Sequence, residues 1–168
     1  MRVILHRAFL QDPENAMQSP QLTHIADFHV EVGAPITIGE TAEGLRRIIP
    51  ITGGHIVGPR LNGEILAAGA DYQLIRADGY STLDARYTAR LDNGALLYIV
   101  NVGVRYGAPE VMEKITRGEP VNPDEVYFRT SPRFETSSAD HQWLLRPLFI
   151  ATGTRHPDRV ELGIYEVS

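Results

Sequence analysis

The 168-residue sequence contains no cysteine. This absence excludes a disulfide framework, a thiolate nucleophile and a thiolate-ligated metal site. The chain also lacks an excess of positive charge, because its formal net charge is -5 and its isoelectric point is about 5.6. Proteins that bind nucleic acid usually present a basic surface. We therefore expect no nucleic-acid partner.

Long apolar runs are missing as well. No stretch approaches the ~20 residues that a helix needs to span a bilayer. The start, MRVILHRAFLQDPEN, has too short an apolar segment for a signal peptide. We expect no membrane partner and a cytoplasmic location. The sequence has no GxSxG or GxxxxGK[ST] motif and no GxGxxG after a strand, so we expect no bound cofactor.

Glycine and proline recur about every eight to twelve residues, and most segments between them alternate apolar and polar side chains. This spacing predicts a single all-β domain, either a sandwich or a barrel. The asparagine–glycine and aspartate–glycine pairs at 62–63, 78–79 and 93–94 supply the positive φ angles of tight turns, so we expect an antiparallel meander over 54–105. The predicted strands are 23–33, 45–51, 54–61, 63–68, 71–77, 81–91, 95–105, 126–135, 142–154 and 159–167.

One short helix is predicted over APEVMEKITRGEP, residues 108–120. Pro109 suits the first turn and Gly118 suits the C-terminal stop. Val111, Met112 and Ile115 share one apolar face, and we expect this helix to plug one end of a barrel or to pack against its wall. The glycines of GGHIVG have no helix behind them to hold a phosphate, so we interpret them as a strand bend or bulge.

The two faces of STLDARYTARL, residues 81–91, differ sharply. Apolar and small side chains alternate with a face that carries Asp84, Arg86 and Arg90. In a generic antiparallel strand the charged face is exposed to solvent. The next segment, ALLYIVNVGVR, has bulky apolar groups on both faces, which indicates a sheet that is covered on both sides or curls round on itself. In a barrel that holds a cavity, a polar inward face lines the pocket.

Several motifs in this region are similar to those of a known family. A GG…GP…NG glycine pattern, GADY, LDARYT, YFRTSPRFET and WLLR follow one another between residues 22 and 168. The sequence resembles the domain-of-unknown-function family 3237, also called uncharacterised protein family 0311. The resemblance implies a closed, lipocalin-like antiparallel β-barrel with a central cavity. It implies no established reaction.

We hypothesise that the charged faces of two strands line this cavity. Tyr127 and Arg129 share one face of residues 126–135, as Asp84 and Arg86 do in their strand. A buried guanidinium needs a carboxylate or a ligand anion, because an unpaired buried charge is costly. The two interpretations are therefore a set of ion pairs that fixes strand register and a preorganised polar patch.

Each candidate residue has an expected role. Asp84 or Asp71 would act as the base, Arg86 and Arg129 as oxyanion donors, and Tyr98 or Tyr127 as the acid. Glu135 would hold Arg129 in place. The candidate ligand-binding residues are Asp71, Tyr72, Glu135, Trp143, Arg146 and Phe149.

The six histidines show no HxH or HExxH spacing, so we expect no metal site. His55 and His141 would be the first to check for a site assembled from distant strands. His141 stands beside Asp140, and we interpret it as a loop residue rather than a general base.

The leading functional hypothesis is cofactor-independent acid–base catalysis, of lyase, isomerase or hydratase type, on a largely apolar small molecule. The main rival is a non-catalytic, lipocalin-like carrier or sensor of a small hydrophobic carboxylate. A third interpretation is a structural module whose interior is filled by its own side chains. Residues 1–22 are expected to form an extension or an extra strand. Their apolar segment VILHRAFL and any open sheet edge favour a homodimer.

Overall fold

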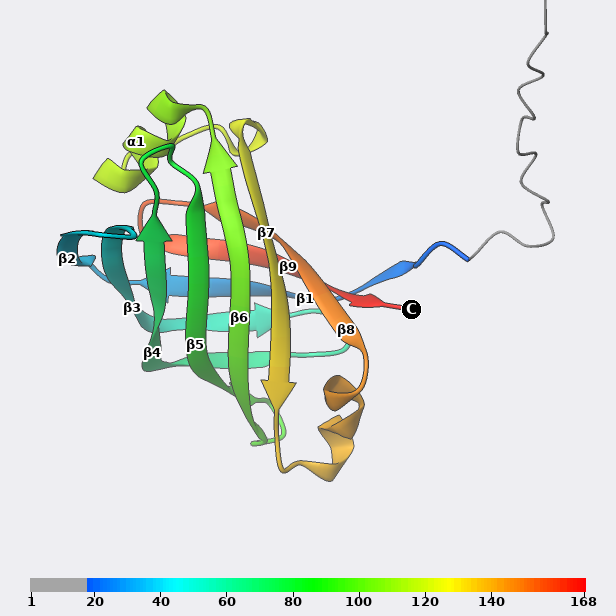
Figure 1. Cartoon of the computed structure of the whole chain (residues 1–168). Coiled ribbons are helices and arrows are strands. Elements are labelled where there is room, and N and C mark those ends of the chain that lie inside the picture. The colour runs from blue at the N-terminus through cyan, green and yellow to red at the C-terminus, as the bar shows by residue number, and fades with distance from the viewer. Residues whose placement is uncertain (1–17) are drawn as a thin grey trace, which may run out of the picture.

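The structure is a computed structural model that describes residues 18–168. Nine strands, one α-helix and two short 3-10 helices make up the described part of the chain (Figure 1). Residues 1–17, which include the VILHRAFL segment, lie outside it. The elements are β1 (Leu22–Val32), β2 (Ile36–Thr41), β3 (Gly44–Val57), β4 (Gly63–Ile75), β5 (Ser81–Leu91), β6 (Leu96–Gly107), α1 (Pro109–Arg117), η2 (Pro123–Glu125), β7 (Val126–Glu135), η3 (Ala139–Leu145), β8 (Leu148–Arg155) and β9 (Arg159–Val167).

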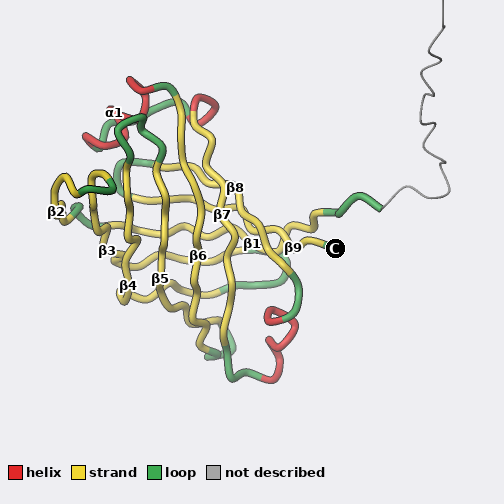
Figure 2. The backbone as a smooth tube through the Cα atoms, in the orientation of Figure 1, coloured by secondary structure: helices red, strands yellow, loops and turns green. Residues whose placement is uncertain are grey.

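The strands form an antiparallel β-barrel closed by a pairing between β1 and β3. The hydrogen-bonded order is β1-β9-β8-β7-β6-β5-β4-β3-β2, and the additional β1–β3 pairing joins the ends of the ring. Eight strands therefore close the barrel, and β2 is added beside the first half of β3. The expected all-β barrel with one short helix is confirmed. Figure 2 shows the strands wrapping round one interior.

A sharp bend in β3 makes this closure possible. The first half of β3 pairs with β2 and the second half pairs with β1. At the bend, Gly54 has a φ of 134°, and a Cβ atom there would lie 2.0 Å from the carbonyl oxygen of His29. A residue with a side chain would be strained and would clash with the neighbouring strand. The register with β4 shifts between Pro50 and His55, so the predicted bulge at GGHIVG is confirmed.

The predicted meander is also confirmed, although its turns differ from one another. β3, β4, β5 and β6 pair consecutively and antiparallel. Gly79 and Gly94 have φ angles of 81° and 85° in their turns, as predicted. The prediction of a tight turn with positive φ at Asn62-Gly63 is wrong. Residues 58–62 form a longer connection, in which the Asn62 side chain accepts from the Gly58 amide and donates to its carbonyl.

Sequence reasoning divided or merged some elements. The segments predicted as separate strands at 45–51 and 54–61 form one bent strand, β3, and those at 63–68 and 71–77 form β4. β2 was not predicted, since ITIGET offers no buried face and its residues are mostly exposed. The predicted strand 142–154 begins as η3, and β8 starts only after Pro147. No helix in the described residues is long and apolar enough to cross a bilayer.

The two ends of the barrel are filled differently. α1 lies at one end and η3 at the other (Figure 1). At the η3 end the interior is filled by aromatic rings, since Phe134 packs edge-on against Phe149 at 5.2 Å and lies 6.4 Å from Phe28. Leu97 and Leu144 complete this packed end. The other end, beneath α1, holds the cavity.

Candidate functional site

The interior of the barrel contains a cavity of about 420 Å³. Its mouth is formed by residues 33–35, by the C-terminal end of α1, and by Pro157 and Asp158 between β8 and β9. The walls are mainly apolar, which is typical of small-molecule sites, and a few polar groups converge on them. Thr116, Arg117 and Asp158 are the polar residues of the mouth, and the polar groups that line the rest of the cavity are Arg47, Asp71, Gln73, Tyr87, Asn101, Arg105, Thr130 and Arg155.

Asp71 is the carboxylate of the barrel wall. It lies on β4, where its Oδ2 accepts a 2.7 Å hydrogen bond from Gln73 and its Oδ1 accepts a 3.1 Å hydrogen bond from the Asp84 amide of β5. Burial raises the pKa of Asp71 above its ordinary value. The bond from Gln73 and the charge of Arg105 oppose this rise. The carboxyl group is thus held in one orientation and retains its proton more strongly than an exposed aspartate.

A group of uncharged polar side chains shares the same part of the cavity. Asp71 pairs with Ala85, and Ala85 pairs with Asn101, so Asp71 and Asn101 flank one position of β5. Tyr87 is the next inward residue on β5 and is 2% exposed. Burial raises the pKa of Tyr87, which keeps its hydroxyl protonated. Among the described residues, no hydrogen-bond partner reaches the Tyr87 hydroxyl, the Asn101 side-chain oxygen or the Thr130 hydroxyl.

Three arginines project into the cavity from β3, β6 and β8. Arg47 and Arg105 are only 5% and 3% exposed. Burial lowers the pKa of Arg105 to about 10, and the charges of Arg47 and Arg155 contribute to the shift. Asp71 opposes it. No described carboxylate forms an ion pair with any of the three guanidinium groups. Nitrogen atoms of all three are buried without a partner in the described structure, namely Arg47 Nε, Arg105 Nε and Arg155 Nη1.

Comparison with known proteins identifies the family. The profile of the family described as "Protein of unknown function (DUF3237)" matches residues 20–167. The chain belongs to this family. It is 45% identical over 136 residues to the UPF0311 protein RPA1785 of Rhodopseudomonas palustris, a match that spans 81% of this chain and 89% of the relative. The resemblance noted from the sequence motifs is confirmed.

Solved structures of similar proteins have the same barrel. The crystal structure of the R. palustris protein, 39% identical in the structural alignment, has a TM-score of 0.86 and covers 91% of this chain and 100% of its own. A β-barrel-like protein from Acinetobacter baumannii, 35% identical, has a TM-score of 0.80 over 92% of this chain and 99% of its own. Both structures support the closed barrel.

Two fungal proteins are more distant. The PR-toxin biosynthesis cluster protein 7 of Penicillium roqueforti is 27% identical over 150 residues, which cover 74% of this chain and 77% of the relative. A structure described as an enzyme from Penicillium herquei is 18% identical, with a TM-score of 0.69 over 92% of this chain and 98% of its own. At this identity the structural likeness shows the fold alone.

The motifs that resemble the DUF3237 family have distinct structural roles. The glycines of the GG…GP…NG pattern include Gly54 at the bend of β3, and Asn62 closes the connection to β4. GADY places Asp71 in the cavity, and LDARYT places Tyr87 there. The first motif therefore shapes the barrel, whereas the other two supply polar groups to its interior.

Of the residues predicted to act in catalysis, Asp71 lines the cavity of this DUF3237 protein and the others do not. On β5 the buried residues, which include Leu83 and Tyr87, occupy the alternate positions, so Asp84 and Arg86 face outward. Asp84 and Arg86 instead form a two-bond ion pair at 3.0 and 3.1 Å on the outer surface. Tyr98, 39% exposed, lies on the same outer surface. The prediction that these side chains line the interior is wrong, because the apolar face of the strand is the buried one.

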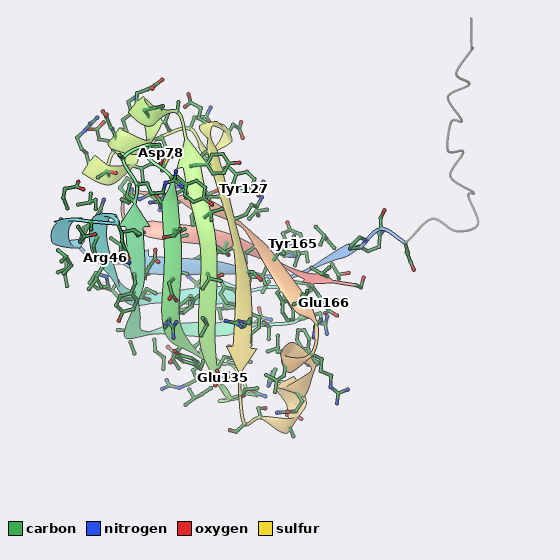
Figure 3. The ribbon with its side chains drawn as sticks, viewed as in Figure 1. Arg46, Asp78, Tyr127, Glu135, Tyr165 and Glu166 are labelled. Atoms are coloured by element: carbon green, nitrogen blue, oxygen red, sulfur yellow. The ribbon has the colours of Figure 1, made fainter. Side chains whose placement is uncertain are left out.

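The same reversal applies to β7. Its buried residues are Phe128, Thr130, Pro132 and Phe134, which alternate with the predicted ones. Figure 3 shows Tyr127 and Glu135 near the two ends of the strand, and both are exposed.

The outward side chains of β7 make other contacts than those predicted. Arg129 donates to the Phe128 carbonyl at 2.8 Å and lies over the Tyr127 ring. It does not pair with Glu135. Tyr127 stacks on Tyr106, with 4.8 Å between their ring centroids.

The other predicted ligand-binding residues also lie away from the cavity. Tyr72 is 45% exposed on the outer face of β4. Phe149 is buried in the packed end, where Trp143 of η3 contacts it at 6.3 Å between ring centroids. Arg146 lines a shallow surface depression in which Arg60 lies 3.6 Å above the Trp143 ring. Trp143 and Phe149 close one end of the barrel, and none of these four predicted residues lines the cavity.

The histidines form no metal site in the described part of the chain, where no cluster of three potential ligands occurs. His55 stacks on His29 on the outer face, with 4.4 Å between ring centroids. His141 Nδ1 lies 3.0 Å from the Ser138 hydroxyl within η3. Neither residue lines the interior cavity.

Sequence reasoning missed most of the polar groups of the cavity: Arg47, Gln73, Tyr87, Asn101, Arg105, Thr130 and Arg155. A usable signal was present in the strands. Asn101 and Arg105 interrupt the apolar inward face that begins with Leu97 and Ile99. An isolated polar residue on an otherwise apolar face is a better indicator of a cavity site than a continuous charged face.

Proposed function

We propose that this protein is a cofactor-independent enzyme that moves a proton to or from a largely apolar organic substrate inside the barrel. The reaction is of the lyase, isomerase or hydratase type, and Asp71 is the group that carries the proton. The observation that carries this proposal is Asp71 itself, a cavity carboxylate with a raised pKa and no ion pair to an arginine in the described structure. Perturbed carboxylates in apolar cavities are frequent at catalytic sites.

The surroundings of Asp71 suit acid–base chemistry. A general base or acid works best when its pKa lies close to the working pH, and burial shifts the pKa of an aspartate in that direction. The bonds from Gln73 and from the Asp84 amide fix the carboxyl group without neutralising its charge. Asp71 is therefore oriented, accessible from the cavity and able to change its protonation state.

Donors for a developing negative charge lie in the same cavity. When Asp71 removes a proton from a carbon beside a carbonyl group, the electrons of the C–H bond form an enolate and the carbonyl oxygen becomes negative. The Tyr87 hydroxyl and the Arg105 guanidinium have donor atoms without partners in the described structure. Preorganised donors of this kind stabilise an oxyanion strongly in a water-poor site.

The two fungal proteins also support an enzymatic function. One similar structure is described as an enzyme and another relative is a biosynthesis cluster protein, which agrees with chemistry on small organic molecules. The rival function, a carrier of a hydrophobic carboxylate, draws on the unpaired interior arginines alone. A carrier that only binds its ligand has no use for a titratable carboxylate that faces the cavity, so Asp71 favours the enzyme.

Deuterium exchange into an apolar ketone tests this proposal. The probe is 2-tetralone, whose α-hydrogens exchange with D₂O only after deprotonation, and ¹H NMR measures the loss of signal. The wild-type protein should accelerate the exchange, and the rate should rise with pH as Asp71 ionises. Asp71→Asn should lower the catalysed rate by about 100-fold or more.

Asp84→Asn is the matched control, since Asp84 contacts Asp71 through its backbone amide but directs its side chain to the outer surface. It should retain the wild-type exchange rate. An Asp71→Asn variant that is folded and still exchanges at the wild-type rate would exclude Asp71 as the proton-transferring group. Absence of catalysed exchange in the wild-type protein would contradict the proposed α-proton chemistry.

A further inference from the structure

Two of the interior arginines, Arg47 and Arg155, lie near the mouth of the cavity, and neither forms an ion pair with a carboxylate of residues 18–168. Arg47 is 5% exposed, and its Nη1 donates to the carbonyl of Thr116 in α1 at 3.1 Å. Arg47 Nε and Arg155 Nη1 are buried without hydrogen-bond partners in the described structure. Burial lowers the pKa of both guanidinium groups, and Arg47 lowers that of Arg155 further by repulsion.

The nearby carboxylates do not neutralise this pair. Asp71 lies deeper, and its charge acts on Arg105. Asp158 stands at the mouth and stabilises the charge of Arg155 from a distance, but it is exposed and its Oδ1 accepts from Arg159 at 3.2 Å. Two like charges held together with unused donors are costly in a folded protein. A ligand anion would offset that cost.

We propose that Arg47 and Arg155 form a carboxylate clamp at the mouth of the cavity, and that the substrate is an amphipathic organic acid whose apolar body extends inward. This substrate class rests on the proposed function, because the clamp and Asp71 belong to the same cavity. Arg47 pairs with Gln73, one inward position from Asp71 on β4, which corresponds to about 7 Å along the strand. The clamp therefore orients the molecule with its acid group outward and its reacting carbon toward Asp71.

The clamp suits a carboxylate better than a phosphate. Two guanidinium groups match the planar, two-oxygen geometry of a carboxylate. Phosphate sites usually add the N-terminus of a helix, whose dipole favours negative charge. Here the C-terminal end of α1, residues 115–118, lines the cavity instead. Its partial negative charge disfavours a doubly charged group.

Matched aromatic probes test the clamp by isothermal titration calorimetry. 2-Naphthoate and 2-naphthamide have nearly the same shape but differ in charge, and 2-naphthyl phosphate adds a second charge. The wild-type protein should bind naphthoate at least about tenfold more tightly than naphthamide, as expected for charge-assisted hydrogen bonds. Equal affinities, or no binding of naphthoate at millimolar concentration, would overturn the clamp. Tighter binding of naphthyl phosphate would overturn the carboxylate assignment.

Arginine variants test whether Arg47 and Arg155 cause the preference for naphthoate over naphthamide. Arg47→Met and Arg155→Met should each remove most of the preference for naphthoate, and Arg47→Lys should give an intermediate affinity because it retains charge but not the two-pronged donor. Arg46→Met is the matched control, since Arg46 is the next residue on β3 and pairs with Glu43 on the outer surface at 3.6 Å. An equal loss in Arg46→Met would show a general charge effect and would overturn the clamp.

Asp71→Asn separates the clamp from the proposed reaction. This variant should lose proton exchange but bind naphthoate at least as tightly as the wild type, because a nearby negative charge is removed. Loss of the naphthoate preference in the arginine variants, with exchange unaffected by Asp71→Asn, would reject the reaction and keep the clamp. The opposite pattern would keep the reaction and reject the clamp.

Discussion

The arginines on the outside of the barrel differ from those inside it. On the outer surface, Arg86 forms two hydrogen bonds with Asp84, Arg90 pairs with Glu64 at 2.5 Å, and Arg159 pairs with Glu161 at 2.8 Å. Inside the barrel, no described carboxylate pairs with Arg47, Arg105 or Arg155. These paired arginines lie at the surface, where pairing contributes least to stability. Arg129 is also exposed and forms no ion pair with a described carboxylate, but water solvates its charge there. Inside the barrel Arg47 and Arg105 are buried and Arg155 is partly buried, and an unpaired charge costs more in such places than at the surface.

This difference supports our proposal that the interior is the functional part of the molecule. A barrel that needed only a stable interior would fill it with apolar side chains, as the packed end around Phe134 and Phe149 does. The cavity end instead retains charges and polar groups without partners. Buried polar groups that stay unpaired are rare in native proteins, and a catalytic role is one of the explanations for them.

The largest expected effect tests which face of β7 is inside. Phe134 is 5% exposed in the packed end, whereas its neighbour Glu135 is exposed. Phe134→Ala should lower the free energy of unfolding by about 3–5 kcal/mol, because it removes a buried ring and leaves a cavity. Glu135→Ala should change it by no more than about 0.5 kcal/mol. Urea denaturation measures both, and similar values would contradict the observed orientation of the strand.

The next prediction concerns Arg105, whose charged form is destabilised by burial. A pKa lowered from 12.5 to about 10 corresponds to roughly 3 kcal/mol against the charged form. Arg105→Met keeps the length of the side chain but removes the charge. It should therefore raise the free energy of unfolding of the unliganded protein by about 1–3 kcal/mol.

Chemical denaturation of Arg105→Met measures this change. Destabilisation of several kcal/mol would instead mean that Arg105 is half of a structural ion pair with Asp71. Arg105 would then be a paired arginine, like those on the outer surface.

The architecture of this protein was largely predictable from local signals. The bounds of β5, β7 and β9 were predicted to within a residue, because alternation and the glycine turns at 79 and 94 are local features. β2 was missed because its six residues bury no side chain. The closure through β1 and β3 depends on the bend at Gly54. The bend was predicted from the glycines of GGHIVG, whereas the closed barrel was implied by the family resemblance.

The site was less predictable because alternation identifies two faces without saying which is inside. On β6 both faces are apolar: Leu97 and Ile99 are buried, while Tyr98 and Val102 are exposed. That outer apolar face suggested that the charged face of β5 was also covered. Asp71 was predicted only as an alternative to Asp84 for the base and as a ligand-binding residue. Arg47 and Arg155 are single arginines near strand ends. Each shares a face with buried apolar residues of its strand, but a charged residue near a strand end was not interpreted as interior.

The pH dependence of stability should report the environment of Asp71. Its pKa is raised in the folded protein above its ordinary value of 3.8. The folded state therefore binds the proton more strongly than the unfolded chain does, and this contribution to stability is lost as the pH rises through the folded pKa. The unfolding free energy of the wild type should fall relative to that of Asp71→Asn from about pH 4 upward, until Asp71 is ionised.

Urea denaturation of both proteins over this pH range measures the difference, and the subtraction removes other groups that titrate. The Glu135→Gln variant provides a control, because Glu135 is exposed and does not contribute to the pKa shift of Asp71, so this variant should follow the wild-type dependence on pH. A difference that is independent of pH would show that Asp71 titrates as an ordinary aspartate. That result would weaken its assignment as the proton-transferring group.

The smallest expected effect belongs to Arg86, on the outer surface. The Arg86 and Asp84 side chains are 51% and 40% exposed, so water and salt screen their attraction. Arg86→Met should leave the melting temperature, the naphthoate affinity and the rate of tetralone exchange within error of the wild-type values. These three measurements together test the comparison between the two arginine environments, since Arg86 and Arg47 have the same chemistry and differ in the face of the barrel that they occupy. If Arg86→Met abolished exchange while Arg47→Met left naphthoate binding intact, the charged face of β5 would be the functional one, and the interior arginines would need a structural explanation.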